Sequence, residues 1–199
     1  MHLLIDFDYT LFNTEAMRRA CIAAVAKCGI TEQDYRAAER ELKAKKLYDI
    51  EHHLDILATG QTRQVIGEVV AAVLKKTDEF LYPDAVSFLQ RHAHHRLTLL
   101  SFGVPTWQER KINGAGITDF FNEVVVTNQS KADMLSRWSK DELIAFNDRG
   151  SEIDTMKAIR PTLKAVWVRR PATPHRTEIC TRADAEVADL SCTVEELFS

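Results

Sequence analysis

The sequence of 199 residues lacks several features that mark particular classes of protein. Its apolar stretches are all too short for a membrane-spanning helix, and no signal-peptide pattern follows Met1 and His2. Charged residues make up 28% of the chain, but the net charge is only −3, so nothing electrostatic favours nucleic acid or an anionic membrane as partner. We therefore predict a cytoplasmic protein that acts on a small molecule.

Cysteine is also scarce, and its spacing matches no known framework. The chain has four cysteines, with no CxxC motif and no short secreted-domain pattern: Cys21, Cys28, Cys180 and Cys192. Reduced thiols are therefore expected, and a zinc site built from them is not. Internal repeats and low-complexity tracts are absent as well, while 45% hydrophobic residues are enough to form a substantial core.

After Pro83 the sequence alternates between helix-like and strand-like stretches. The pattern predicts strands at 97–100, 124–126, 143–146 and 165–168, an edge strand at 187–190, and helices ending near 95 and at 106–113, 130–138, 151–159 and 193–198. Such alternation predicts a parallel sheet covered on both faces. We therefore expect an α/β protein with a Rossmann-like, three-layer parallel sheet core.

A different pattern occupies the region between the first predicted strand and this core. Residues 14–79 are rich in Ala, Glu, Lys and Leu at helical spacing, with interruptions at Gly29 and Gly60 and no strand-like alternation. We interpret this region as an all-helical cap inserted into a core domain made of residues 1–13 and 80–199.

Two features of the insert carry more specific predictions. Thr31 and Asp34 have the spacing of a capping box at the start of a helix. The helix that follows has a charged face, which we expect to be solvated, although it could instead meet an anionic substrate: Glu39, Arg40, Lys43, Lys45 and Lys46.

The most informative residues are two acids that directly follow the apolar run 3–5. Asp6 and Asp8 are two apart, so a strand ending here would direct both carboxylates to one side. Two neighbouring anions need a cation or a shared proton. This arrangement suits chemistry in which one carboxylate attacks an electrophile, the other handles a proton, and a divalent ion offsets the charge.

Further polar residues follow the later strands. Ser101 comes after the strand at 97–100, Lys131 lies just after the strand at 124–126, and Asn147 with Asp148 follows the strand at 143–146. In open α/β sheets, reactive groups gather beyond the carboxyl ends of the strands. A nucleophilic acid, a hydroxyl, a lysine and a further acid would suit phosphoryl transfer through an acyl phosphate.

In this arrangement the chain resembles the haloacid dehalogenase-like hydrolase superfamily. Residues 6–10 reproduce its first motif, DxDx[TV], and 99–101 match the second, an apolar strand that ends in Ser or Thr. Lys131 stands where the third motif has its lysine, and 147–152 resemble the fourth, GDxxxD. Gln108, Lys111 and residues 117–121 are similar to the stretch after the second motif, and the helical insert stands where type-C1 caps occur.

The resemblance implies an activity and a role for each motif residue. Asp6 would attack phosphorus to form an aspartyl phosphate, and Asp8 would protonate the leaving alcohol and later activate water. Ser101, Lys131 and the backbone N–H near Phe102 would bind phosphoryl oxygens. Magnesium would be held by Asp6, the backbone carbonyl of Asp8 and Asp148, with Glu152 near a metal-bound water. The implied function is a Mg²⁺-dependent phosphatase acting on a small phosphorylated metabolite.

Alternatives remain open at this level. Asn147 replaces the glycine of the fourth motif, and Glu152 replaces its second aspartate; Glu152 could equally support a helix that opens with a capping box of Ser151 and Asp154. The same fold also serves 2-haloacid dehalogenases, which attack carbon without a metal, and phosphotransferases or mutases. A descendant without catalysis that binds a phosphorylated ligand or a protein is a further alternative.

Overall fold

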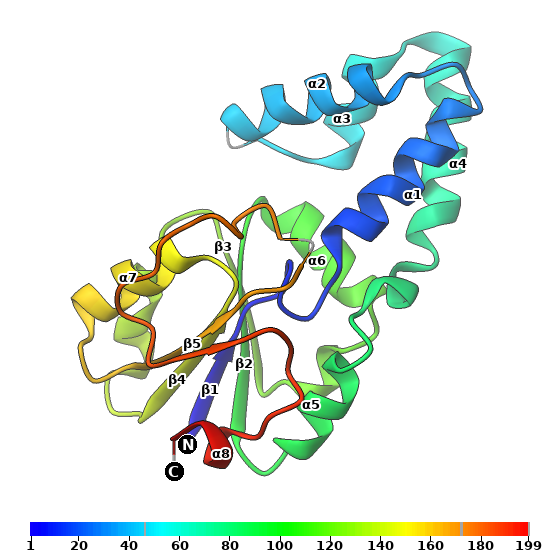
Figure 1. Cartoon of the computed structure of the whole chain (residues 1–199). Coiled ribbons are helices and arrows are strands. Elements are labelled where there is room, and N and C mark those ends of the chain that lie inside the picture. Colours follow the sequence, from blue (N-terminus) through cyan, green and yellow to red (C-terminus); the bar gives the residue numbers. More distant parts are fainter. Residues whose placement is uncertain (46, 172, 199) are drawn as a thin grey trace.

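The centre of the molecule is a parallel sheet of six strands in the order β3-β2-β1-β4-β5-β6 (Figure 1). The computed structural model describes residues 1–45, 47–171 and 173–198. The strands are β1 (His2–Ile5), β2 (Arg96–Phe102), β3 (Glu123–Thr127), β4 (Leu143–Asn147), β5 (Lys164–Val168) and β6 (Ala185–Val187). All five strand pairs are parallel, which confirms the predicted sheet.

Alternate residues of each strand pack on opposite faces of this sheet, and each face has its own hydrophobic core. Leu3 and Ile5 belong to one core and Leu4 to the other. On the first face lie α5 (Ala85–Arg91), α6 (Pro105–Gly114) and α8 (Val194–Phe198); the second is covered by η3 (Lys131–Trp138) and α7 (Gly150–Ile159). The strands are therefore buried on both sides, and the Rossmann-like, three-layer α/β core is confirmed.

Four helices follow β1 before the chain returns to the sheet. They are α1 (Thr14–Ala26), α2 (Glu32–Ala44), α3 (Ile50–Leu57) and α4 (Gly60–Leu74), and the short η1 (Thr77–Phe80) leads back to the core. Figure 1 shows α1 and α4 rising from the sheet, with α2 and α3 above the end where the strands point. We refer to these four helices as the cap. That the cap is a separate domain stays a prediction.

The expected helix start at Thr31 is confirmed, although the Asp34 carboxylate accepts a hydrogen bond from the Thr31 hydroxyl instead of from the Thr31 backbone N–H that a capping box uses. Thr31 is the N-cap, and its hydroxyl oxygen accepts a hydrogen bond from the backbone N–H of Asp34 at 3.1 Å. The expected box of Ser151 and Asp154 is wrong, because Arg149 occupies the N-cap position of α7. The carboxylate of Asp154 instead accepts hydrogen bonds from the backbone of Thr181 and Arg182.

Other boundaries also differ from the sequence prediction. The edge strand ends at Val187 instead of starting there, because Leu190, the next large apolar residue, packs into the core and donates its N–H to Asp84 at 2.7 Å. The predicted helix at 130–138 is the 3₁₀ helix η3, and α5 ends at Arg91, four residues before the predicted end. The sequence prediction places His92 to His95 in this helix, whereas His92 is the residue that caps its end.

Two findings concern the predictions made from composition, on the cysteines and on membrane-spanning helices. The four cysteines are free thiols, as expected. Among the residues that the structure describes, no helix has both the length and the apolar character that crossing a membrane requires.

Candidate active site at the carboxyl ends of the strands

A tight turn after β1 positions the two acids of the first motif. The carbonyl of Phe7 accepts hydrogen bonds from the backbone N–H groups of Leu11 and Phe12, and the rings of Phe7 and Phe12 stack 4.7 Å apart. Tyr9 takes a left-handed backbone conformation with φ of 59°. Such strain in a non-glycine residue is typical of functional sites. The phenol oxygen of Tyr9 accepts a hydrogen bond from Arg18, which holds the turn against α1.

Asp6 lies at the end of β1 and is almost completely buried. Its Oδ1 accepts a hydrogen bond from the backbone N–H of Phe7 and lies 2.7 Å from Nζ of Lys131. Nζ of Lys131 also lies 2.9 Å from Oε2 of Glu152. Burial raises the pKa of Asp6 to about 6, although the charge of Lys131 opposes this shift. One buried lysine therefore serves two acids.

The two departures from the fourth motif are coupled in the structure. Nδ2 of Asn147 donates to Oε2 of Glu152 at 2.9 Å, and Oδ1 of Asn147 accepts the backbone N–H of Arg149. Nη1 of Arg149 lies 3.3 Å from the other oxygen of Glu152. Both oxygens of Glu152 thus have donors already, which favours a role in holding Lys131 over direct metal ligation.

Asp148 adds a third buried acid to this group. Its carboxylate accepts a hydrogen bond from the hydroxyl of Thr173, and its backbone carbonyl accepts one from the indole N–H of Trp167. Burial raises the pKa of Asp148, and the negative charge of Asp6 adds to the shift. The two acids are therefore close enough to repel each other.

The charges around Asp6 suit a divalent cation. Asp6 and Glu152 share the buried Lys131, Asp148 lies close by as a third carboxylate, and of these three acids Arg149 contacts Glu152. Carboxylate and carbonyl oxygens are the ligands that Mg²⁺ prefers. The donor set of Asp6 and Asp148 with the carbonyl of Asp8 therefore fits a magnesium ion.

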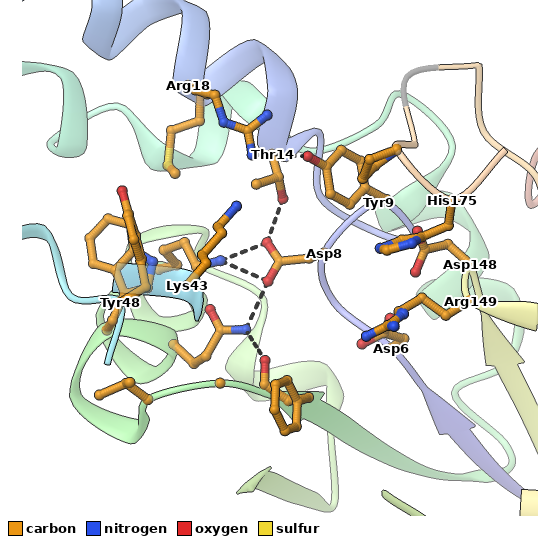
Figure 2. Close-up of a pocket in the computed structure, with 18 of the residues that line it drawn as sticks. Asp6, Asp8, Tyr9, Thr14, Arg18, Lys43, Tyr48, Asp148, Arg149 and His175 are labelled. Carbon is orange, nitrogen blue, oxygen red and sulfur yellow. Dashed lines mark hydrogen bonds and ion pairs between the residues drawn. The ribbon is translucent and has the colours of Figure 1, made fainter. Parts of the chain in front are cut away.

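Asp8 has very different surroundings. Its two oxygens lie 2.6 and 2.8 Å from Nζ of Lys111, Gln108 donates to one of them at 2.8 Å, and the hydroxyl of Thr14 donates to the other (Figure 2). Burial would raise the pKa of Asp8, but the charge of Lys111 together with the hydrogen bonds from Lys111, Thr14 and Gln108 outweighs it and lowers that pKa. The Asp8 side chain is therefore held as an anion.

The predicted phosphate-binding residues take three different positions. Lys131 lines the cavity beside Asp6, and Phe102 lines it with a partly exposed ring. Ser101 lies behind Gln108, whose Nε2 donates to its hydroxyl oxygen at 2.8 Å, and does not belong to the described lining residues. The phosphate-binding roles of all three stay predictions.

A cavity of about 500 Å³ opens over these residues, between the core and the cap. Its core wall includes Asp6, Asp8, Trp107, Lys111, Lys131, Asp148, Arg149, Glu152 and His175, and its cap wall includes Met17, Arg18, Tyr35, Glu39, Lys43 and Tyr48. Figure 2 shows Asp8 near the middle, with Asp6, Asp148 and Arg149 on one side and Lys43 and Tyr48 on the other. The volume is typical of a pocket for a small molecule.

The cap wall corrects the expected solvation of the charged face on α2. Glu39 is buried, and its Oε1 lies 2.9 Å from Nε of Arg18 and 2.8 Å from Nζ of Lys43, both of which line the cavity. Lys45 pairs with Glu41 and is exposed, as expected, while Lys46 lies outside the described residues. The helical spacing of charged residues in the sequence shows that they share one face of α2. It cannot show that part of this face is turned towards the core.

Several residues in the cavity lining or beside it were not assigned a role from the sequence. Thr14, Tyr48 and His175 have no motif around them, and Thr173 reaches Asp148 from a loop beyond β5. Gln108 and Lys111 were noted only as part of a similar stretch. Their positions, three residues apart in α6 and so on one helix face, were the available signal.

No protein-family model and no curated protein matches this sequence. Solved structures do match. A protein described as a haloacid dehalogenase-like hydrolase from Burkholderia xenovorans has a TM-score of 0.76 and 21% identity, over 95% of this chain and 94% of that one. Over the matched length the chain thus has the haloacid dehalogenase-like fold, as its motifs predicted.

Two further solved structures with this fold differ in what they bind. The hydrolase YfnB from Bacillus subtilis, bound to magnesium, has a TM-score of 0.63 and 15% identity over 99% of this chain and 96% of that one. The L-2-haloacid dehalogenase from Xanthobacter autotrophicus, with chloropropionic acid covalently bound, has a TM-score of 0.63 and 19% identity over 95% and 94%.

Proposed function

We propose that this protein is a Mg²⁺-dependent phosphohydrolase that acts on a small phosphorylated metabolite through an aspartyl phosphate. The observation that carries the proposal is the placement of Asp6. It is buried at the floor of a cavity, paired with Lys131 and crowded by the carboxylates of Asp148 and Glu152. A nucleophile with a spare cation site beside it suits attack on an anionic phosphoryl group.

Each residue of the site has a proposed role. An oxygen of Asp6 forms the new bond to phosphorus while the bond to the leaving oxygen breaks. Lys131 offsets charge on Asp6 and contacts the transferred group, and Glu152 and Asn147 hold Lys131 in place. In the second half-reaction, Asp8 as a carboxylate accepts a proton from the water that releases phosphate.

Asp6, Asp148 and the backbone carbonyl of Asp8 would hold the magnesium ion. When bound, the ion supplies positive charge that neutralises the phosphoryl oxygens and the crowded carboxylates. Asp8 must take up a proton before it can protonate a leaving group, and Lys111, which contacts both its oxygens, controls how readily it does so.

A second candidate activity is dehalogenation of a 2-haloacid. It is favoured by the structural neighbour that carries covalently bound chloropropionic acid. Attack on carbon requires no metal, however, and would leave the acids around Asp6 without a counter-charge. We therefore place it second, ahead of phosphoryl transfer to a sugar and of binding without catalysis.

The decisive assay measures phosphate release from 4-nitrophenyl phosphate and chloride release from 2-chloropropionate, each with Mg²⁺ and with EDTA. We expect phosphate release that needs Mg²⁺ and no chloride release. Asp6→Asn should lower phosphate release at least about a thousandfold, because the amide is a poor nucleophile. Circular dichroism should show an unchanged fold, since Asn has the shape of Asp.

Three results would contradict the proposal. Chloride release that EDTA does not affect would assign the protein to the dehalogenases. Phosphate release that is equal in Asp6→Asn would come from a contaminant or from a different site. No release of either ion across a panel of phosphorylated metabolites would favour a protein that binds without catalysis.

A further inference from the structure

The cap contributes one cation to the cavity that is only partly paired. Nζ of Lys43 lies 2.8 Å from Oε1 of Glu39, and its side chain is 50% exposed. The same oxygen of Glu39 already accepts a hydrogen bond from Arg18. An ammonium group has three donors, so Lys43 keeps donors free for a ligand.

The other cap cation on this wall is already engaged. Arg18 contacts Glu39, Glu15 and the phenol oxygen of Tyr9, and only about a tenth of its side chain is exposed. Arg149 belongs to the far side of the cavity, beside Asp148, where it contacts Glu152 (Figure 2). Among the lining residues that the structure describes, Lys43 is therefore the cation best placed to meet the distal end of a substrate.

An aromatic wall lies next to Lys43. Its Nζ is 5.6 Å from the centre of the Tyr48 ring, and that ring meets Trp107 edge-on with 5.9 Å between centres. Met17 and Tyr35 extend the same wall. Figure 2 places Asp8 between this end and Asp6, so a ligand with its phosphoryl group at Asp6 would direct its other end towards Lys43.

We propose that Lys43 is a specificity residue: the substrate is a phosphate monoester whose leaving group has a flat apolar body and ends in a second anionic group, which Lys43 binds. The inference rests on the proposed function, because it takes the phosphoryl end to lie at Asp6. The aromatic wall covers the body of the leaving group, and the free donors of Lys43 bind its anionic end through charge-assisted hydrogen bonds. The cavity has room for both parts.

The test measures binding instead of turnover. The probes are (4-carboxybenzyl)phosphonate and (4-carbamoylbenzyl)phosphonate, which have nearly the same shape and differ in the charge of the distal group. Calorimetry with the full chain and Mg²⁺ should give about tenfold tighter binding of the carboxylate, the typical contribution of one charge-assisted hydrogen bond.

Three variants assign this preference to Lys43. Lys43→Met should bind both probes equally, while Lys43→Arg should retain the preference for the carboxylate. Lys45→Met is the matched control, because Lys45 lies on the same helix but pairs with Glu41 at 2.6 Å outside the cavity lining. It should behave as the unchanged protein does. A thermal melt of each variant shows that the cap remains folded.

The inference is overturned if the unchanged protein binds both probes equally or binds neither, or if Lys43→Met retains the preference. Its failure is separable from failure of the proposed function. A Lys43-dependent preference in a protein that releases no phosphate would leave this inference standing and remove the phosphatase, and active hydrolysis without the preference would do the reverse.

Discussion

The two acids of the first motif are two residues apart and share one turn, yet their surroundings are opposite. Asp6 shares Lys131 with Glu152 and faces Asp148, so negative charge is in excess around it. Asp8 has Lys111 to itself and also accepts hydrogen bonds from Thr14 and Gln108. Burial raises the pKa of Asp6, whereas Lys111 lowers that of Asp8.

The difference arises from the elements that pack against each acid. Lys131 starts η3 after β3 and reaches Asp6 from one side of the sheet, while Lys111 reaches Asp8 from α6 on the other side. Phe7, Phe12 and Trp107 surround Lys111, with ring centres 5.5 to 5.8 Å from its Nζ. Asp8 and Lys111 form a charge-balanced pair, whereas the acids around Asp6 keep an excess of negative charge that a cation could offset.

Replacing either lysine should have the largest effect on stability, and the two variants should differ in their response to Mg²⁺. Lys131→Met and Lys111→Met each leave buried carboxylates without their cation, and we expect each to lower the free energy of unfolding by about 3 kcal/mol in EDTA. Magnesium should restore much of the loss in Lys131→Met, because the ion can replace the missing positive charge. It should not restore Lys111→Met, since Asp8 offers the ion only its backbone carbonyl.

Urea unfolding with and without Mg²⁺ measures both effects. The gain in stability that Mg²⁺ gives the unchanged protein is the reference, because it measures the effect of ion binding alone. An equal Mg²⁺-dependent recovery in the two variants would show that the ion also reaches the Asp8 side chain, and the proposed separation of the two acids would be wrong.

The positions on the Asp6 side were predictable from the sequence, because they depend on local patterns. An apolar run followed by an acid marks the end of a buried strand, and the carboxyl ends of parallel strands meet at one edge. These two rules bring together Asp6, Lys131 and Asp148. The coupling of Asn147 to Glu152 also has a local signal, since both departures lie five residues apart.

The Asp8 side was less predictable, because it depends on contacts between remote segments. The side chains of Gln108 and Lys111 lie about a hundred residues from Asp8 in the sequence. One contact on the Asp6 side is also remote, because Thr173 reaches Asp148 from beyond β5. The exposure of Lys43 to the cavity depends on how α2 sits above the sheet. Periodicity reports which residues share a face of a helix, but not what that face meets.

Stability at different pH values should distinguish the two acids by the sign of the effect. In metal-free protein the pKa of Asp6 is raised from 3.8 to about 6. The unfolded chain therefore loses this proton first, and stability falls as the pH rises from about 4 to 6. Asp6→Asn should remove this penalty and stabilise the protein at pH 7 by about 3 kcal/mol.

Asp8→Asn should do the opposite. The pKa of Asp8 is lowered, so its contribution is fully present above its unfolded pKa and is lost as the pH falls through the folded value. The variant should be less stable than the unchanged protein at pH 7, with a difference that narrows below about pH 4. Urea unfolding in EDTA from about pH 2.5 to pH 7.5 checks both. Shifts of the same sign for the two variants would contradict the different surroundings of the acids.

A smaller effect is expected from Gly103, which lies beside the Asp8 cluster. Its φ is +154°, and an added Cβ would lie 2.7 Å from Cγ of Gln108, the residue that donates to Asp8 and Ser101. Gly103→Ala must displace Gln108, so we expect a loss of about 1 to 2 kcal/mol in stability and weaker catalysis. The stabilisation by Mg²⁺ should be unchanged, because the substitution does not touch the Asp6 side.

Gly116→Ala is the matched control for this substitution. Gly116 also has a positive φ, +67°, but nothing lies within 4 Å of the added Cβ. It should lose about 1 kcal/mol through backbone strain alone and keep its activity. If the two variants lost activity equally, the effect would come from strain and not from Gln108. If Gly103→Ala weakened the response to Mg²⁺, the two acids would be coupled through the turn that they share, and the Asp8 side would help to shape the cation site.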